Sequence, residues 1–350
     1  MKKLLFALLI VTFALSTTIF ADSTSTRKII IDTDTGADDA AALILAAGSP
    51  NVEIVGVTVL AGNVDLEQGT KNALATLELI SCDVPVYKGS EIRYDGTAIS
   101  PHSVFGTDGM GDMDLIHPKR TAEEEDAIDF ILDTVRSSPG EIEIVMLGPA
   151  TNIAMAIDKD PETMKQVKQI WSMGTPGING PGNASPVSEF NVYLDAPAYS
   201  KVLDFCVPVT VIGLDVCDGE SKWSDDNFEK LAKFGKVGRF VTDSFRQIRE
   251  FYKSNGSAGS VMNCDGTAMI CVVCPEIISD SRQCHGSCIT ESGETYGQVI
   301  FYQKGFKYDL TSGEDFDYNV TLVSDVDRRA CFMEYLSRIG SLIVKVFLSD

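Results

Sequence analysis

The sequence has few basic residues for its length. Its 350 residues include 29 Lys and Arg against 50 Asp and Glu, which leaves a formal net charge of −21. A negative field of this size repels nucleic acid polymers and anionic membranes. We therefore expect small neutral or cationic molecules, or metal ions, as partners, and no DNA or RNA polymer.

Long apolar runs are missing after the N-terminus, so no later segment is expected to cross a membrane. The one early run, residues 4–15, is too short for a comfortable span and follows Lys2 and Lys3. This pattern is typical of a signal peptide, which we place at residues 1–21. We expect a secreted or periplasmic protein whose mature part, residues 22–350, forms a single domain.

Histidine is scarce, with three residues, whereas cysteine is not, with nine. Cys271 and Cys274, together with Cys284 and Cys288, raise the alternative of a zinc site. The first pair lies in an apolar, helix-like run, however, so buried thiols or disulfides fit better. Because nine is an odd number, at least one thiol is free or pairs with another chain.

Internal repeats and low-complexity segments are also absent, and apolar strands alternate with helical segments instead. The strands are continuous apolar runs, which is typical of a sheet covered on both faces. The alternation predicts an α/β fold with a doubly wound, mostly parallel central sheet flanked by helices. The expected strands are 28–32, 53–59, 142–147, 169–173 and 209–214, and the expected helices are 37–47, 66–80, 126–136, 152–157 and 197–205. Further along, we expect helices within 225–253 and 265–274 and short strands within 289–306 and 320–323.

Four carboxylates lie within eight residues at the end of the first expected strand: Asp32, Asp34, Asp38 and Asp39. Ligands of open α/β sheets bind at this edge. Acids in the first turn of a helix also stabilise its dipole, but that does not explain Asp32 and Asp34. Carboxylates this close repel one another unless they share a proton or bind a cation. The cluster predicts a site for a hard dication, Ca²⁺ or Mg²⁺.

Amides and carboxylates follow other strands at the same edge of the predicted sheet. Asn63 follows the second strand, and a Gly- and Pro-rich loop after the strand 169–173 leads to Asn183 and then to Glu189 and Asn191. Such groups around a metal are what the hydroxyls of a sugar require.

These strings together resemble the inosine-uridine-preferring nucleoside hydrolase family. The segment 32–39 is similar to the family signature of two alternate aspartates, a glycine and an aspartate pair. The strings Leu147-Gly148-Pro149-Ala150-Thr151-Asn152 and Glu189-Phe190-Asn191 resemble two further blocks in the same order. The resemblance covers about residues 27–350. It implies a Rossmann-like nucleoside hydrolase fold, hydrolysis of the bond between base and ribose in purine or pyrimidine salvage, and a homo-oligomer, dimeric or tetrameric.

The resemblance also implies roles for individual residues. Ca²⁺ would be held by the carboxylates of Asp34, Asp39 and Asp265 and by the main-chain carbonyl of Leu147. Asp38 would act as the general base on a calcium-bound water. The residues implied to contact the ribonucleoside are Asn63, Met173, Asn183, Glu189, Phe190, Asn191 and Asp265.

The sequence departs from the family at two positions where histidine is common. Cys264 stands before Asp265, and Phe105 stands before Gly106, so protonation of the leaving base by histidine lacks its usual residues. Both are candidates for the base pocket: Cys264 as a weak acid or a small pocket residue, and Phe105 as a stacking or a core residue. The remaining histidines, His102, His117 and His285, are expected to be surface or structural residues.

Two alternatives remain open at this point. Asp32 and Asp34 also match the first positions of the nucleophile motif of haloacid-dehalogenase-like phosphatases, but that leaves Asp38 and Asp39 unexplained. The loss of both histidines would also suit a secreted nucleoside-binding protein without activity. The presence of the candidate base and of all candidate calcium ligands argues against it.

Overall fold

The computed structural model describes residues 26–100, 104–256, 259–305 and 316–349. The expected signal peptide lies outside them. A nine-stranded sheet runs through the molecule in the order β3-β2-β1-β4-β5-β6-β9-β7-β8. Its strands are β1 Arg27–Thr33, β2 Val52–Val59, β3 Val86–Lys88, β4 Ile142–Met146, β5 Gln169–Met173, β6 Val209–Ile212, β7 Ile278–Cys288, β8 Val299–Gln303 and β9 Val320–Val326.

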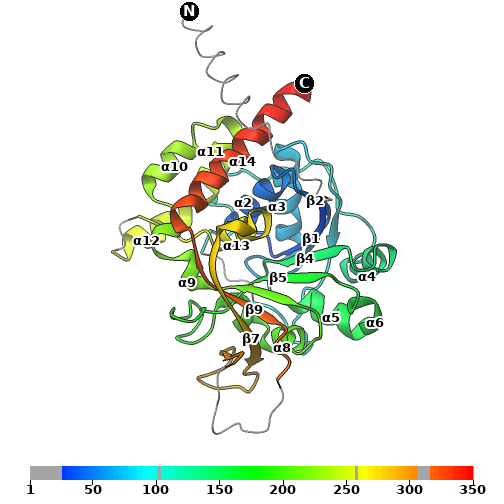
Figure 1. Cartoon of the computed structure of the whole chain (residues 1–350). Coiled ribbons are helices and arrows are strands. Elements are labelled where there is room, and N and C mark those ends of the chain that lie inside the picture. The colour runs from blue at the N-terminus through cyan, green and yellow to red at the C-terminus, as the bar shows by residue number, and fades with distance from the viewer. Residues whose placement is uncertain (1–25, 101–103, 257–258, 306–315, 350) are drawn as a thin grey trace, which may run out of the picture.

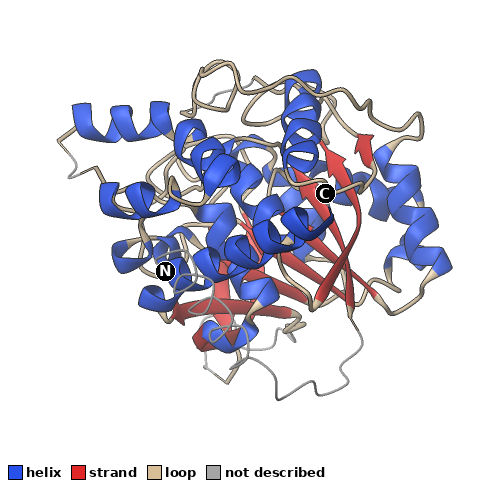
Figure 2. Ribbon diagram, turned by 90° about the horizontal axis from the view of Figure 1, so that it is seen from above, coloured by secondary structure: helices blue, strands red, loops and turns tan. Residues whose placement is uncertain are grey.

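Helices cover both faces of this sheet, as Figures 1 and 2 show. They are α2 Ala37–Ala47, α3 Leu66–Leu79, α4 Ala127–Ser137, α5 Thr151–Lys159, α6 Pro161–Met164, α7 Phe190–Leu194, α8 Ala196–Leu203, α9 Leu214–Cys217, α10 Asp225–Leu231, α11 Gly235–Ser244, α12 Arg246–Ser254, α13 Cys264–Val273 and α14 Arg328–Ser349, with short 3₁₀ turns at Gly219–Ser221 and Pro275–Ile277. No helix among the described residues is both long and apolar enough to cross a bilayer.

The sheet is mostly parallel, which confirms the predicted fold class. All strands from β3 to β9 in the sheet order pair in parallel, and β7 alone runs antiparallel to its neighbours β9 and β8. Parallel strands need a crossover between them, and helices supply these crossovers here.

Alternate residues of β1 show why its centre, Ile29 to Ile31, is a continuous apolar run. Ile29 and Ile31 belong to a core formed with α2, α3, α13 and α14, whereas Ile30 belongs to a second core formed with α4, α5 and α8. Successive side chains of a strand point to opposite faces, so a strand covered on both faces buries every one of them.

The chain order reverses direction around β1, which pairs with β2 on one side and with β4 on the other. From β1 the chain first continues toward one edge of the sheet, through β2 and β3. It then returns to the other side of β1 and continues from β4 toward the opposite edge. Such a switch point leaves a crevice beyond the carboxyl ends of the two strands. This crevice receives the ends of β1 and β4, where the acidic cluster and Leu147 lie.

The sequence-based expectation was wrong at the far end of the sheet. Strand β7 was missed, and of the segment 289–306 only β8 is a strand. The residues of β7 read ISDSRQCHGSC, and most of them are not buried, so the strand carries no apolar signal. Its place is set by pairing with β9, which is a tertiary effect. Leu214, expected to end a strand, instead begins α9.

The zinc alternative is also wrong. Cys271 and Cys274 are buried in the core formed with α2, whereas Cys284 and Cys288 are buried in the core on the opposite face of the sheet. The four thiols cannot meet around one ion. All four are outside disulfides, in agreement with the expectation of buried thiols.

Candidate active site

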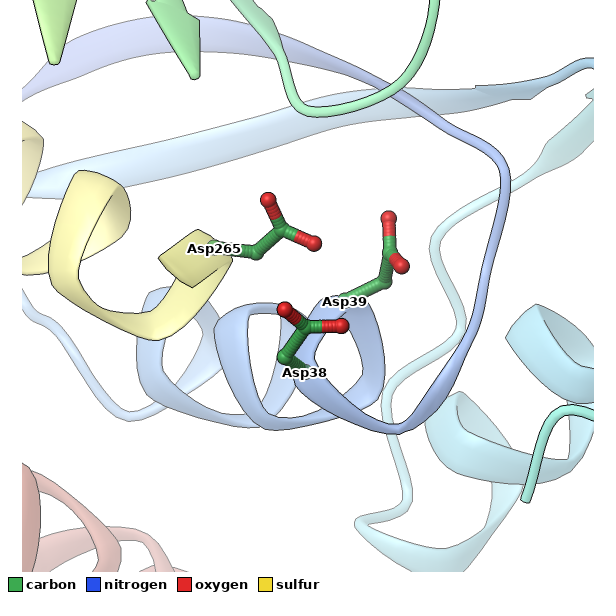
Figure 3. Close-up of side chains that lie close together, drawn as sticks. All are labelled: Asp38, Asp39 and Asp265. Carbon is green, nitrogen blue, oxygen red and sulfur yellow. The ribbon is translucent and has the colours of Figure 1, made fainter. Parts of the chain in front are cut away.

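Three carboxylates converge at the crevice. Asp38 and Asp39 come from the first turn of α2, and Asp265 comes from the first turn of α13. Figure 3 shows the three side chains turned toward one another. Each offers an oxygen, and these oxygens lie within 4.8 Å of one another. Among the residues that the structure describes, this is the one group of at least three His, Cys, Asp or Glu side chains close enough to hold a metal.

The start of α2 fixes the orientation of Asp39. Its carboxylate accepts hydrogen bonds from the backbone N–H of Gly36 at 2.8 Å and from the hydroxyl of Thr33 at 2.5 Å. The side-chain amide of Asn63 adds a third at 3.2 Å. These donors come from β1, the turn after it and the loop after β2, so the carboxylate is held from three directions.

Asp34 lies in a close-fitting niche beside the three acids. Its Oδ2 accepts the backbone N–H of Asn63 at 2.6 Å, whereas its Oδ1 is buried without a partner among the described residues. A Cβ added to Gly62 would lie 2.1 Å from Oδ2, and one added to Gly148 would lie 3.1 Å from Oδ1. Gly62 is therefore needed for the backbone to approach this carboxylate, and a side chain at Gly148 would lie in tight contact with it.

Burial and mutual repulsion make the ionised cluster costly without a counterion. Burial, followed by the charge of Asp39, raises the pKa of Asp38 to about 8. For Asp34 and Asp265, burial is the main cause and the charges of neighbouring carboxylates are the second. Together they raise the pKa of both residues well above the usual range of an aspartate. An all-oxygen set with unpartnered atoms on Asp34 and Asp38 fits a hard dication, which would supply the missing positive charge.

Asp32 stands apart from this group. Its Oδ1 accepts the hydroxyl of Thr58 at 2.6 Å and the amide of Asn152 at 2.8 Å, and the residue is fully buried. It does not line the cavity described below. A phosphatase nucleophile must reach its substrate, so the haloacid-dehalogenase alternative has no accessible Asp32 to use.

A cavity of about 310 Å³ opens over the cluster. Its size and mixed lining suit a small ligand with one polar and one apolar part. The predicted site residues that line it are Asp38, Asn63, Phe105, Leu147, Met173, Asn183, Glu189, Phe190, Asn191, Cys264 and Asp265. The other two predicted ligands, Asp34 and Asp39, are buried and do not line it.

The polar half of the cavity is built around α7. Glu189 caps this helix by accepting the N–H of Val192 at 3.2 Å, and burial raises the pKa of Glu189 to about 7. The amide of Asn191 donates to the Leu147 carbonyl at 2.6 Å, which ties α7 to the end of β4. The side chain of Asn183 accepts the N–H of Phe190 at 2.8 Å.

The apolar half of the cavity contains residues that were not predicted individually from the sequence. They are Val104, Ile248, Phe251, Tyr252 and Met262, beside Phe105 and Cys264. Phe105 packs edge-on against Phe245 at 5.8 Å between ring centroids. Three of the unnamed residues lie on α12, and only the i, i+4 spacing of Ile248 and Tyr252 hinted at a shared face.

Neither of the two histidines that the structure describes lines the cavity. His117 is exposed, and His285 lies in the distant β7, stacked on Phe316. His102 lies outside the described residues.

Comparison with known proteins adds a second line of observations. Residues 29–333 match the family model described as inosine-uridine preferring nucleoside hydrolase. Uridine nucleosidase 1 of Arabidopsis thaliana is 35% identical over 257 residues, covering 72% of this chain and 76% of that protein. A pyrimidine-specific ribonucleoside hydrolase of Escherichia coli is 30% identical over 285 residues, covering 80% of this chain and 88% of that protein.

Solved structures show the same likeness. A purine-preferring ribonucleoside hydrolase from Gardnerella vaginalis superposes with a TM-score of 0.82 at 30% identity, covering 91% of this chain and 99% of that one. A plant nucleoside hydrolase superposes with a TM-score of 0.80 at 26% identity, covering 90% of this chain and 99% of that one.

Proposed function

The chain belongs to the inosine-uridine-preferring nucleoside hydrolase family and is a nucleoside N-ribohydrolase, and we propose that it acts with Ca²⁺ and with Asp38 as general base. The observation that carries this proposal is the buried acidic cluster at the floor of a cavity large enough for a nucleoside. Ionised carboxylates this close repel one another, and a bound cation would offset that cost.

The ligands proposed for the ion are Asp34, Asp39, Asp265 and the Leu147 carbonyl. When bound there, calcium would orient the attacking water and lower its pKa. The compact trio contains Asp38 rather than Asp34. We keep Asp38 as the base because it lines the cavity, where a substrate can be reached, whereas Asp34 does not.

The remaining steps follow from the residues around the cavity. Asp38 takes the proton of the water as its oxygen attacks C1′ of the ribose. Positive charge develops on the ribose ring as the bond to the base breaks, and nearby carboxylates and amide oxygens stabilise it. Asn63, Asn183, Glu189 and Asn191 are proposed to hold the ribose hydroxyls.

The nucleobase of the substrate is proposed only as a class. The names of similar proteins include a uridine nucleosidase, a pyrimidine-specific hydrolase and a purine-preferring one. We therefore propose ribonucleosides as substrates without choosing between purine and pyrimidine.

The variant Asp38→Asn tests the assignment of Asp38 as the general base. The fold is expected to persist because the shape is kept, while kcat falls by roughly 10²–10⁴-fold, as for loss of a general base. KM is expected to change little, because the lost interaction belongs to the transition state. Steady-state release of free base from inosine and uridine measures both constants. Near-normal kcat in this variant would show that another group takes the proton.

A further inference from the structure

The loop after β5 leads to Asn183 at the cavity, and it contains neither helix nor strand. Its residues 174–182 include four glycines and two prolines. Glycine gives a free chain many alternative conformations, so a loop of this composition needs contacts that select one of them. The contacts that fix this loop therefore also fix where Asn183 lies.

Asp215 of α9 supplies such contacts with its side chain. Its Oδ2 accepts the backbone N–H of Ile178 at 2.8 Å and that of Asn179 at 3.2 Å. A carboxylate is a stronger acceptor for such donors than a neutral group. Its Oδ1 is buried without a partner among the described residues, and a Cβ added to Gly177 would lie only 1.9 Å from it. The loop thus closes tightly around this one carboxylate.

The backbone at Asp215 ties the same loop to α9. The N–H of Leu214 donates to the Thr175 carbonyl at 3.1 Å. The N–H of Asp215 donates to the Pro176 carbonyl at 3.3 Å. The carbonyl of Asp215 accepts a hydrogen bond from Arg328 of α14 at 2.8 Å, which joins α9 to that long helix. Helix α9 is therefore a support fixed by the fold, and the loop is the part that it holds.

Thr175 has a backbone conformation that a free loop would avoid. Its φ of 74° lies in the left-handed region, which is unfavourable for a β-branched residue. Such a conformation persists where surrounding contacts impose it. The N–H of Thr175 donates to the Glu189 carboxylate, which also accepts backbone donors from Phe190, Asn191 and Val192. Glu189 therefore does not depend on the loop alone.

We propose that Asp215 is a positioning residue for the ribose side of the cavity, and this role rests on the proposed ribohydrolase function. Asp215 does not line the cavity itself. It holds the loop in the conformation that presents Asn183, whose side chain accepts the N–H of Phe190 at 2.8 Å and so joins the end of the loop to α7. The effect of Asp215 on the reaction passes mainly through Asn183.

Two substitutions at Asp215 separate loss of the loop contacts from loss of the charge. Asp215→Ala removes both oxygens, and we expect kcat/KM for inosine and uridine to fall by roughly 10- to 100-fold, as for a displaced substrate-binding group. Asp215→Asn keeps an oxygen that can accept the same two N–H groups, so kcat/KM should stay within about threefold of wild type. Asp218→Ala is the matched control, because the Asp218 carboxylate contacts Gly219 and Lys222 rather than the loop.

A double-mutant cycle tests whether the effect passes through Asn183. In an Asn183→Ala background, Asp215→Ala should lower kcat/KM by less than about threefold further, because the group that it positions is already gone. A merely structural role would lower kcat/KM by the same factor in both backgrounds, and that result would overturn the proposal. If Asp215→Ala failed to fold, Gly177→Ala would break the same contact from the loop side and should give the same pattern.

Hydrogen exchange in the full-length protein reports on the loop without any nucleoside. Asp215→Ala should speed exchange of the amides of Ile178 and Asn179 by about tenfold or more, whereas Asp215→Asn and Asp218→Ala should leave it near wild type. Unchanged exchange in Asp215→Ala would overturn the loop contacts, and faster exchange with unchanged kcat/KM would overturn the positioning role alone. If the wild-type protein released no base from any nucleoside, the proposed function would fall and the positioning role with it, whatever the exchange rates.

Discussion

Asp34 and Asp38 are both buried acids of one short string, yet their surroundings differ. Asp34 is enclosed by Gly62, Gly148 and the backbone of Asn63, and it does not reach the cavity. Asp38 lines the cavity and has an oxygen without a hydrogen-bond partner among the described residues. These surroundings fit Asp34 as a candidate metal ligand and Asp38 as a candidate general base.

The variant Asp34→Asn should therefore behave unlike Asp38→Asn. It removes one negative charge from the calcium site, so calcium affinity is expected to fall while kcat at saturating calcium stays much closer to wild type. Titration of activity with calcium measures this. A variant whose activity excess calcium cannot raise at all would contradict the assignment of Asp34 as a ligand.

The single residues of the site differ in how far the sequence predicted them. The acids at 32–39 are close in sequence and in space, so their string already indicated a metal site. Asp265 and Asn191 required the family resemblance, because only the fold brings α13 and α7 to the end of β1. Tyr252 belongs to no motif, and its spacing from Ile248 indicated only a shared helix face, so the cavity is needed to place it in the site.

Strands β1, β4 and β5 are joined on their amino-terminal side by Glu143. This carboxylate of β4 accepts hydrogen bonds from Arg27 of β1, from Lys168 at 2.9 Å and from the indole N–H of Trp171 at 2.9 Å. Burial on its own would raise the pKa of Glu143, but these three donors together outweigh it and lower that pKa to about 2.

Replacing Glu143 should weaken the fold in a pH-dependent way. Glu143→Gln is expected to lower the free energy of unfolding by about 3 kcal/mol near neutral pH, since it leaves the charge of Arg27 without its carboxylate partner. Because the folded-state pKa lies below the value of 4.5 for an ordinary Glu, the stabilisation is present above about pH 5 and is lost as the pH falls toward 2. Urea unfolding near pH 7 and near pH 3 measures the difference.

The exposed Glu141 is the matched control for Glu143. It pairs with Lys28 on the surface, so Glu141→Gln should change the free energy of unfolding by less than about 1 kcal/mol at either pH. An equal effect of the two variants, or an effect of Glu143→Gln that grows as the pH falls, would contradict this account of the sheet.

At the level of elements, the sequence predicted best where apolar runs are continuous. Helix α2 and strand β5 have the predicted bounds, because each is covered by neighbours along its length. The polar strand β7 could not be predicted from its sequence, because most of its residues are not buried. Its pairing with β9 and β8 holds it in the sheet instead. The segment 225–253 was expected to be helical, and it forms α10, α11 and α12.

For the molecule as a whole, charge and topology act together. The net charge of −21 predicts that no nucleic acid polymer is a partner. The reversal of chain order at β1 then places the acidic cluster at the cavity. The homo-oligomer implied by the resemblance and the single mature domain expected from the sequence both stay predictions.

The most direct test of the central claim is release of free base and ribose from a panel of ribonucleosides, with and without a calcium chelator. Our account predicts many turnovers per molecule on at least one nucleoside, loss of turnover on chelation, and recovery when calcium is restored. Turnover that survives complete removal of metal would contradict the calcium proposal. Stoichiometric binding without release of base, or release of phosphate from a nucleotide in place of base, would contradict the ribohydrolase account itself.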